Sequence, residues 1–328
     1  MTQPSIAIIG AGISGLVIAQ ALKNLAHITI YEKARGVSGR MSTRSATPYQ
    51  FDHGAQYFTA KTQAFQAFLA PYLAEGSIAL WQPQIIVLEK DKPSYNYENS
   101  QPKYVATPKM NSLGKILAEG IPICLQTQIA TLQRSGEKWQ LITTAGVTLP
   151  RFDWVISTAP APQTLNIFPP AFSEYHTLQQ VKMLACYCLM VGLPTQPALN
   201  WQAAVVLNSP IGWIAYNTHK PGRNQAYHSM VLQSTNNWAE EHLEEDLANI
   251  QHLLLEESIK LTGIEPKNLS YITTHRWRYA DTAISAQKNY LLDESLQLAA
   301  CGDWCIKGRV EAAFTSGNSL ASRMVQLL

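Results

Sequence analysis

The sequence has few charged residues and no block of one sign. Lys, Arg, Asp and Glu make up 15% of its 328 residues, and the formal net charge is +2. A balance so close to zero gives no indication of a nucleic acid or an anionic membrane surface as partner. No apolar run approaches the roughly 18–20 residues of a transmembrane helix. With 46% hydrophobic residues, the composition is that of a globular protein of one large or two medium domains.

Cysteine is also scarce. The five cysteines lie at positions 124, 186, 188, 301 and 305. An odd number gives no complete disulfide framework, and no two pairs have zinc-binding spacing, so we expect no metal. The first residues lack the charged and apolar regions of a signal peptide. We therefore expect a soluble cytoplasmic enzyme.

Hydrophobic patterning predicts an α/β protein without internal repeats. Apolar runs ending in turn residues predict strands, and longer runs with helical periodicity predict helices. The strands are expected at 5–9, 27–32, 121–133, 138–144, 153–158, 184–191, 203–207, 213–216, 227–233, 270–277 and 298–302. The helices are expected at 14–25, 62–73, 111–119, 239–262 and 308–328, and 33–58 is expected to be a long loop.

This order fits a Rossmann-like nucleotide-binding domain interleaved with a β-rich substrate domain. The expected boundaries assign 1–60, 106–162 and 284–328 to the nucleotide-binding domain. Residues 61–105 and 163–283 are assigned to the substrate domain.

A glycine-rich turn connects the first expected strand to the first expected helix. Gly10 permits the tight turn, Gly12 lets the backbone approach a diphosphate, and Gly15 lets the helix pack closely on the sheet. The N-terminus of that helix attracts phosphate, and Glu32, 20 residues after Gly12, is placed to accept hydrogen bonds from a ribose. The alternative is a glycine-rich turn without ligand. Because NAD and FAD share the ADP portion, the turn alone does not distinguish them.

Further motifs favour a flavin. Residues 35–44 read R-G-V-S-G-R-M-S-T-R, 51–58 read F-D-H-G-A-Q-Y-F, and 301–313 read C-G-D-W-C-I-K-G-R-V-E-A-A. These strings resemble the flavoprotein amine-oxidase superfamily. Together with H-R-W-R-Y-A at 275–280, they resemble the renalase family in particular, over most of the chain. Relatives commonly have glycine where this chain has Ser38, and a small residue where it has Lys307.

The resemblance implies non-covalent FAD. An apolar strand leading to Asp303, with a helix after Gly308, independently predicts a second helix N-terminus for the cofactor, and an ordinary closing strand and helix is the alternative. Cys305 would permit a covalent flavin link, which the renalase resemblance disfavours. The residues expected at the cofactor are Gly10, Gly12, Ile13, Ser14, Gly15, Glu32, Lys33, Arg40, Met41, His53, Gly54, Ala55, Gln56, Ile129, Thr158, Gly302, Asp303, Arg309, Val310, Glu311 and Ala313.

The same resemblance implies oxidation of the 2- and 6-dihydro isomers of NAD(P)H, yielding NAD(P)⁺ and, with O₂, hydrogen peroxide. Hydride transfer to flavin N5 needs no general base, so no catalytic side chain is expected. The expected substrate pocket is aromatic with polar edges, and if Gln233 lies in it an amide recognises the carboxamide. Each of these side chains has a place in the core as its alternative. The pocket candidates are Tyr57, Trp213, Tyr216, Asn217, Gln233, Trp277 and Tyr279.

Three other functions fit the same scaffold. An amine oxidase or desaturase would use the flavin on an amine, a flavin-bound scaffold or sensor would not turn over, and an NAD-only dehydrogenase would hold no flavin. The expected partners are a small dihydronicotinamide and O₂, with no nucleic acid and no membrane.

Overall fold

The computed structural model describes residues 3–328, which form two compact units. Unit 1 comprises the chain up to Met41, Leu113–Met183 and Asp281–Leu328, and unit 2 comprises Ser42–Ser112 and Leu184–Ala280. The division differs from the expected one at four places, two of them short: 106–112 belongs to unit 2 and 281–283 to unit 1. Residues 42–60 belong to unit 2 because the hydrogen bonds of Asp52 tie them to it, and 163–183 belong to unit 1 as a pair of short helices.

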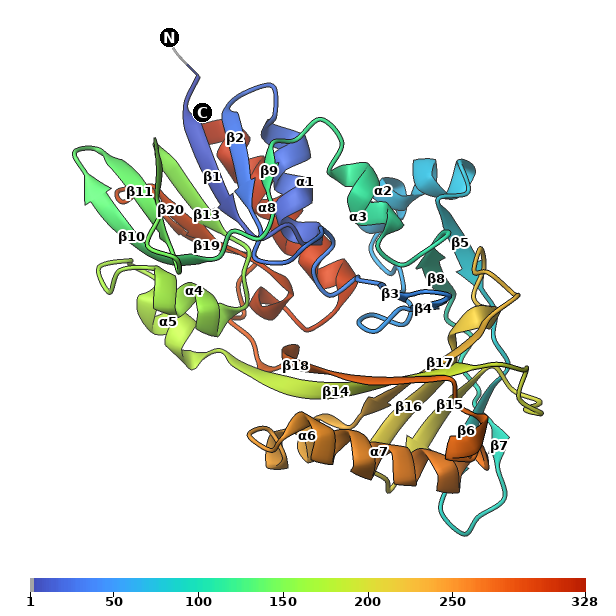
Figure 1. Cartoon of the computed structure of the whole chain (residues 1–328). Helices are drawn as coiled ribbons and strands as arrows, with labels where there is room; N and C mark the ends of the chain where they lie inside the picture. Colours follow the sequence, from blue (N-terminus) through green and yellow to red (C-terminus); the bar gives the residue numbers. More distant parts are fainter. Residues whose placement is uncertain (1–2) are drawn as a thin grey trace. The chain divides into compact units, whose positions relative to one another are not determined.

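A six-stranded sheet forms the centre of unit 1, in the order β19-β20-β13-β1-β2-β9 (Figure 1). All neighbours are parallel except β19, which is antiparallel to β20. The almost wholly apolar run of β1 suits its central position, where helices cover both faces of a parallel sheet. The bounds are β1 Ser5–Ile9, β2 His27–Tyr31, β9 Ile123–Cys124, β13 Trp154–Ser157, β19 Leu291–Asp293 and β20 Leu298–Ala300.

The first and last helices of unit 1 pack against each other. Helix α1 spans Ile13–Leu22 and helix α8 spans Val310–Leu327. The hydroxyl of Ser14 donates to the carbonyl of Ala313 at 2.7 Å. A Cβ atom on Gly317 would lie 2.7 Å from the carbonyl oxygen of Ser14, so the close approach requires glycine there. Segments at opposite extremes of the sequence are thus joined, as the neighbouring blue and red helices of Figure 1 show.

Smaller elements complete unit 1. Strands β10 (Ile129–Ser135), β11 (Lys138–Thr143) and β12 (Thr148–Phe152) form an antiparallel sheet. The short helices α4 (Ala161–Ile167) and α5 (Tyr175–Gln180) were not expected, because prolines at 160 and 162 indicated only the end of a strand. Proline is tolerated in the first turn of a helix, where its missing N–H costs no hydrogen bond. Helix α3 (Ser112–Leu117) and the 3₁₀ turn Asp303–Cys305 complete the list.

A seven-stranded sheet organises unit 2, in the order β18-β14-β17-β16-β15-β6-β7. Helices α6 (Asn236–Glu241) and α7 (Leu247–Thr262) lie along one of its faces (Figure 1). Apolar side chains of the sheet and of α7 meet in the core between them, among them Tyr187, Leu189, Ile214 and Leu254. The strands are β6 Ile85–Glu89, β7 Tyr95–Asn96, β14 Lys182–Leu193, β15 Ala203–Leu207, β16 Ile211–Tyr216, β17 His228–Ser234 and β18 Tyr271–Ile284. Unit 2 also contains α2 (Gln63–Ala74) and the strand pairs β3 (Arg44–Ala46) with β4 (Tyr49–Phe51) and β5 (Ile78–Trp81) with β8 (Lys103–Ala106).

The single helix expected at 239–262 is two helices. Helix α6 covers Asn236–Glu241 and helix α7 covers Leu247–Thr262. The carboxylate of Asp246 accepts a hydrogen bond from the backbone N–H of Ala248, which makes Asp246 the N-cap of a new helix. Apolar periodicity continues across the break, so the pattern alone did not reveal it.

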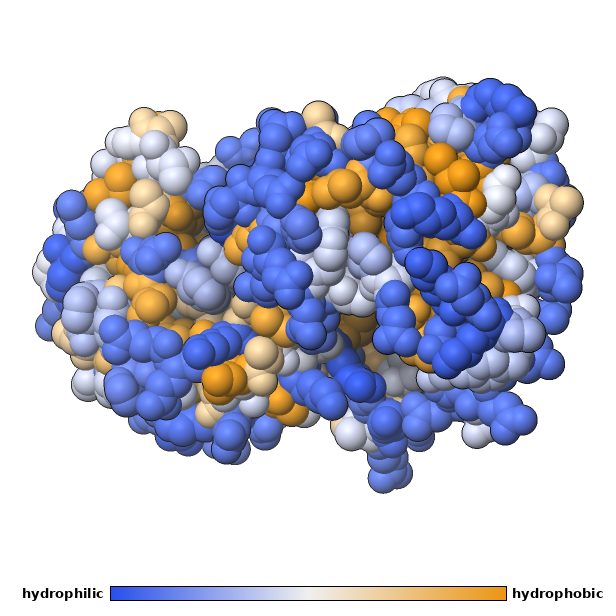
Figure 2. All heavy atoms as spheres, turned by 90° about the horizontal axis from the view of Figure 1, so that it is seen from below, coloured by the Kyte–Doolittle hydropathy of each residue, from blue (hydrophilic) through white to orange (hydrophobic). Residues whose placement is uncertain are grey.

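On the face shown in Figure 2, hydrophilic residues predominate and hydrophobic ones occur in separate groups between them. Among residues 3–328, no helix combines the length and the apolar character that a membrane span requires.

Candidate functional site

The glycine turn after β1 has the geometry of a phosphate-binding turn. Gly10 adopts φ +105°, which side chains disfavour. A Cβ atom on Gly15 would overlap the carbonyl oxygen of Gly10, so α1 approaches the turn as only glycine permits. A Cβ atom on Gly12 would meet nothing within 4 Å. Gly12 is the N-cap of α1 and no side chain caps the helix, so open space lies beside a helix N-terminus.

Glu32 anchors this turn from the end of β2. Its side chain is buried, and its two carboxylate oxygens accept hydrogen bonds from the backbone N–H groups of Ala11 and Ala34, each at 2.8 Å. A carboxylate has about four acceptor positions, so these two bonds leave capacity for ribose hydroxyls. Glu32 therefore holds the turn in shape and remains suited to a ribose.

The segment 38–40 packs on the glycine turn. The N–H of Ser38 donates to the carbonyl of Ala11 at 2.8 Å, and a Cβ atom on Gly39 would lie 3.2 Å from the Cα of Gly12. Ser38 has φ +92°, a conformation that favours glycine, so the glycine that the family resemblance led us to expect here would suit this backbone. Space for its side chain comes from Gly114, where a Cβ atom would overlap the Ser38 Oγ.

Arg40 connects this segment to the C-terminal motif. Its guanidinium forms two hydrogen bonds with the carboxylate of Asp303, at 2.8 and 2.5 Å, and Asp303 is almost completely buried. Asp303 directly follows Gly302, whose N–H donates to the Ser316 hydroxyl of α8. These bonds place the residues that follow β20 beside the segment that packs on Gly12.

The arrangement in unit 1 fits FAD. Open space at Gly12 suits the diphosphate, Glu32 suits the adenosine ribose, and the start of α8, whose N-cap Arg309 forms no side-chain cap, offers a second helix N-terminus. Of the other expected cofactor residues of unit 1, Ile13, Met41 and Ile129 are buried, whereas Lys33 and Arg309 are exposed. Thr158 Oγ1 donates to the carbonyl of Gly10 at 3.0 Å. Val310, Glu311 and Ala313 form the first turn of α8.

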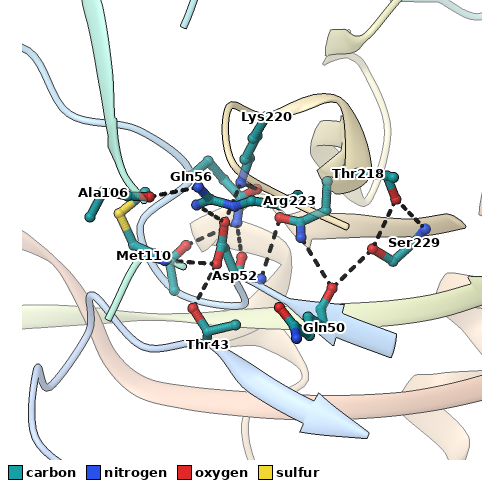
Figure 3. Close-up of polar contacts among 12 residues, drawn as sticks. Thr43, Gln50, Asp52, Gln56, Ala106, Met110, Thr218, Lys220, Arg223 and Ser229 are labelled. Atoms are coloured by element: carbon teal, nitrogen blue, oxygen red, sulfur yellow. Dashed lines mark hydrogen bonds and ion pairs between the residues drawn. The ribbon is translucent and has the colours of Figure 1, made fainter. Parts of the chain in front are cut away.

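A buried cluster of charges organises unit 2 (Figure 3). The carboxylate of Asp52 accepts hydrogen bonds from Lys220 at 3.3 Å and from Arg223 at 2.6 Å, and all three side chains are at most 3% exposed. Thr43 Oγ1 and the N–H of Met110 also donate to it. Burial alone raises the pKa of Asp52, but the two cations outweigh it and lower this pKa to about 2.

The charge cluster holds the motif at 52–56 in place. Trp277 Nε1 donates to the carbonyl of His53 at 2.9 Å, and Gln233 Nε2 donates to the carbonyl of Gly54 at 2.8 Å. Gln56 donates to the carbonyls of Asp52 and Gly54 and accepts from Lys220. His53, Gly54, Ala55 and Gln56, all expected at the cofactor, therefore form one rigid loop of unit 2.

The two histidines of this region are poor bases. His53 stacks on Trp277 at a centroid distance of 5.2 Å, and His275 lies edge-on to both rings. Burial, with the nearby His275 and Arg44, lowers the pKa of His53 to about 3. Burial and Arg44 lower the pKa of His275 to about 4. Both imidazoles are therefore neutral at neutral pH.

Four of the expected pocket residues lie at or beside the 52–57 segment, and two others are buried in the interior of unit 2. Tyr57 and Trp213 lie together, with ring centroids 5.7 Å apart, and Trp277 and Gln233 hold the 52–56 loop. Tyr216 is buried in the core of unit 2, where its hydroxyl is hydrogen-bonded to His228. Asn217 is fully buried and its amide contacts the backbones of Gln50 and Asp52. The placement of Tyr216 and Asn217 favours a structural role for both.

Tyr279 lies half-buried on β18. Sequence reasoning did not select Trp81, Asp52, Lys220 or Arg223. Asp52 stood within a quoted motif, but nothing in the pattern paired it with cations more than a hundred positions further along the chain.

The sequence is similar to a known domain family and to a known protein. The family profile described as "NAD(P)-binding Rossmann-like domain" matches residues 8–72. Renalase of Mus musculus is 24% identical over 307 residues, which cover 85% of this chain and 85% of that protein.

Solved structures with the same fold include oxidases. A putative protoporphyrinogen oxidase from Exiguobacterium sp. 255-15 has a TM-score of 0.79 at 12% identity, with all of both chains covered. Cyclohexylamine oxidase from Brevibacterium oxydans IH-35A has a TM-score of 0.76 at 12% identity, with 99% of both chains covered. At such identities the likeness establishes the fold, a Rossmann-like domain interleaved with a β-rich one.

Proposed function

We infer that this chain, a renalase-like protein with the fold of the flavin amine oxidases, is a flavin-dependent oxidoreductase, and we propose that FAD is its cofactor and dihydronicotinamides are its substrates. The observation that carries the proposal is in unit 1. The open turn at Gly12, the anchored Glu32 and the Arg40–Asp303 pair bring together residues from distant parts of the chain. An enzyme that binds only a nicotinamide dinucleotide has no need of the C-terminal part of this site, which consists of Asp303 and the N-terminus of α8.

Non-covalent binding of the cofactor is supported by the state of Cys305, the cysteine that follows Asp303 in the C-terminal motif. Cys305 is fully buried, and burial raises the pKa of its thiol to about 12. A buried, protonated thiol is a poor nucleophile, since the thiolate is the reactive form. Acid precipitation of the purified protein is expected to release all of its flavin into the supernatant.

Bound FAD would supply a two-electron acceptor for a hydride from a 2- or 6-dihydro isomer of NAD(P)H, and the two electrons would then pass to O₂ to give hydrogen peroxide. The product is NAD(P)⁺. The chain's own residues would orient the reactants: Glu32, held by the N–H of Ala11, would bind the adenosine ribose, Arg40 fixes Asp303, and Tyr57 and Trp213 would offer aromatic faces to the substrate ring. No proton is removed from carbon, consistent with the lowered pKa values of His53 and His275.

Anaerobic stopped-flow spectroscopy tests this function. The flavin absorbance of the purified protein is expected to bleach within seconds of mixing with 2- or 6-dihydro-NAD, and not with a panel of primary amines. Bleaching by amines alone would replace the proposal with an amine oxidase or desaturase. Bleaching by neither would remove the proposed substrate, and a colourless preparation would remove the flavin.

A further inference from the structure

Three aromatic side chains of unit 2 form a cluster on which the proposed substrate ring would lie. The ring of Tyr57 is 6.0 Å from that of Trp81 and 5.7 Å from that of Trp213, at interplanar angles of 50° and 53°. Trp81 is 3% exposed. Trp81 Nε1 and Trp213 Nε1 are both buried and have no hydrogen-bond partner within the described residues. The cluster therefore contains two donors that an acceptor on a ligand would satisfy.

Two lysines already occupy ring faces of this cluster. Lys103 Nζ lies 5.8 Å from the ring centroid of Tyr57, and Lys220 Nζ lies 5.6 Å from that of Trp81. Both lysines are buried, at 5% and 0% exposure. A cation within about 6 Å of a ring centroid is the arrangement by which aromatic cages bind substrate ammonium groups. Here the chain's own ammonium groups hold that position.

The charges around the cluster are not balanced. Lys220 and Arg223 share the single carboxylate of Asp52. Lys103 donates to the backbone carbonyls of Asn99 and Gln101, and among residues 3–328 it forms no ion pair. Three cations thus face one carboxylate in a buried region, where charges are weakly screened. The surroundings of the three rings are positive.

We propose that Lys103 and Lys220 determine the charge of the substrate: the Tyr57–Trp81–Trp213 cluster admits an aromatic or dihydroaromatic ring that is uncharged or carries anionic or carbonyl oxygens, and excludes alkylammonium groups. This inference rests on the proposed function only for the position of the substrate at Tyr57 and Trp213. An amine would meet two like charges and donors without acceptors. A pyridine-type ring with a carboxamide, attached to a pyrophosphate, meets neither obstacle.

A matched pair of probes tests the proposal on the flavin-loaded protein. Benzoate and benzylamine carry the same ring and opposite charges, and each is titrated while the intrinsic tryptophan fluorescence is recorded. The wild type is expected to bind benzoate more tightly than benzylamine by about 10-fold or more. This is the effect of one additional attraction between opposite charges in a partly desolvated site. Equal affinities, or no benzoate binding at tens of millimolar, would overturn the proposal.

The variants Lys103→Met and Lys220→Met assign the effect. Each is expected to lower the benzoate-to-benzylamine ratio about 10-fold, whereas Lys103→Arg, which keeps the charge, leaves it unchanged. Lys90→Met removes an exposed lysine of the same unit and serves as the control. If Lys220→Met does not fold, Lys103→Met decides alone. A ratio that does not change in the methionine variants sinks the proposal.

Failure of the proposed function has a different signature. If the dihydro-NAD isomers do not bleach the flavin but the probe ratio shifts as described, the charge preference holds and the substrate assignment fails. If the isomers bleach the flavin and the ratio is indifferent to both lysines, the proposed function holds and this inference fails.

Discussion

The carboxylate of Asp52 accepts a hydrogen bond from the guanidinium of Arg223 at 2.6 Å, although both side chains are at most 3% exposed. Because Lys220 shares the same carboxylate, removing Asp52 would leave two buried cations without a counter-charge. The pair also joins segments of unit 2 that lie far apart in the sequence. Because these groups ionise, their contribution to the free energy of unfolding is expected to depend on pH.

Stability is expected to fall in acid as Asp52 is protonated. Its pKa is lowered from 3.8 to about 2 in the folded state, so its contribution is fully present above 3.8 and is lost as the pH falls from 3.8 toward 2. The loss is about 2 kcal/mol in the free energy of unfolding. Urea titrations over this range are expected to show a loss about 2 kcal/mol larger in the wild type than in Asp52→Asn, which is destabilised throughout but keeps the acid-sensitive carboxylates Asp153, Glu174 and Asp293. Parallel acid profiles for the two proteins would contradict this assignment.

Stability is expected to rise in mild alkali through Lys220. Burial, opposed by Asp52 and assisted by Arg223, lowers the pKa of Lys220 from 10.5 to about 8. Between these values the unfolded chain binds more protons than the folded one, so the free energy of unfolding increases with pH. The groups facing Lys220 are Asp52, Arg223, Gln56, Cys188 and the ring of Trp81. The difference in unfolding free energy between the wild type and Lys220→Met is expected to change across this window, and a constant difference would refute the prediction.

Two neighbouring glycines are expected to separate folding from cofactor binding. Gly12→Ala places a methyl group in open space, so the apoprotein should retain its free energy of unfolding within about 1 kcal/mol while losing flavin affinity. Gly15→Ala places the methyl group against the carbonyl of Gly10 and should cost about 3 kcal/mol. Denaturant unfolding of apoproteins and flavin fluorescence titrations measure the two quantities. Full flavin affinity in Gly12→Ala would argue against a diphosphate at that turn.

Ser38→Gly is expected to stabilise the protein. Ser38 has φ +92°, and replacing it with glycine removes a backbone strain of about 1 kcal/mol. The control is Ser38→Ala, which keeps the Cβ atom and the strain but removes the hydroxyl. The melting temperature of Ser38→Gly is expected to exceed that of the wild type, whereas that of Ser38→Ala is not. Equal melting temperatures for the two variants would mean that the backbone at this position is not strained.

Local patterns were sufficient to predict the nucleotide-binding unit. The strand, the turn at Gly10, Gly12 and Gly15, helix α1 and Glu32 follow one another within the first 32 residues, so each is constrained by its neighbours in the sequence. The break between α6 and α7 was missed because the helical conformation is interrupted before Asp246, the N-cap of α7, whereas the apolar periodicity of the sequence continues.

The charged part of the candidate site was beyond sequence reasoning. Lys220 and Arg223 pair with Asp52 across unit 2, and no local spacing relates residues so distant in the chain. Trp81 ends a strand in a region whose prolines made its structure hard to predict. Such contacts depend on the tertiary fold, whereas a local motif can be recognised from residues that are adjacent in the sequence.

The packing of α8 on α1 has a consequence for biosynthesis. Strand β20 pairs with β13, and the Ser14 hydroxyl of α1 donates to the carbonyl of Ala313 in α8. Helix α1 therefore lacks its packing partner until α8 has been synthesised. A nascent chain emerges from the ribosome N-terminal end first and therefore cannot complete this unit until α8 has been synthesised. Capture of the proposed coenzyme would then follow translation of α8, and a premature stop codon ahead of that helix would leave a polypeptide destined for proteolysis.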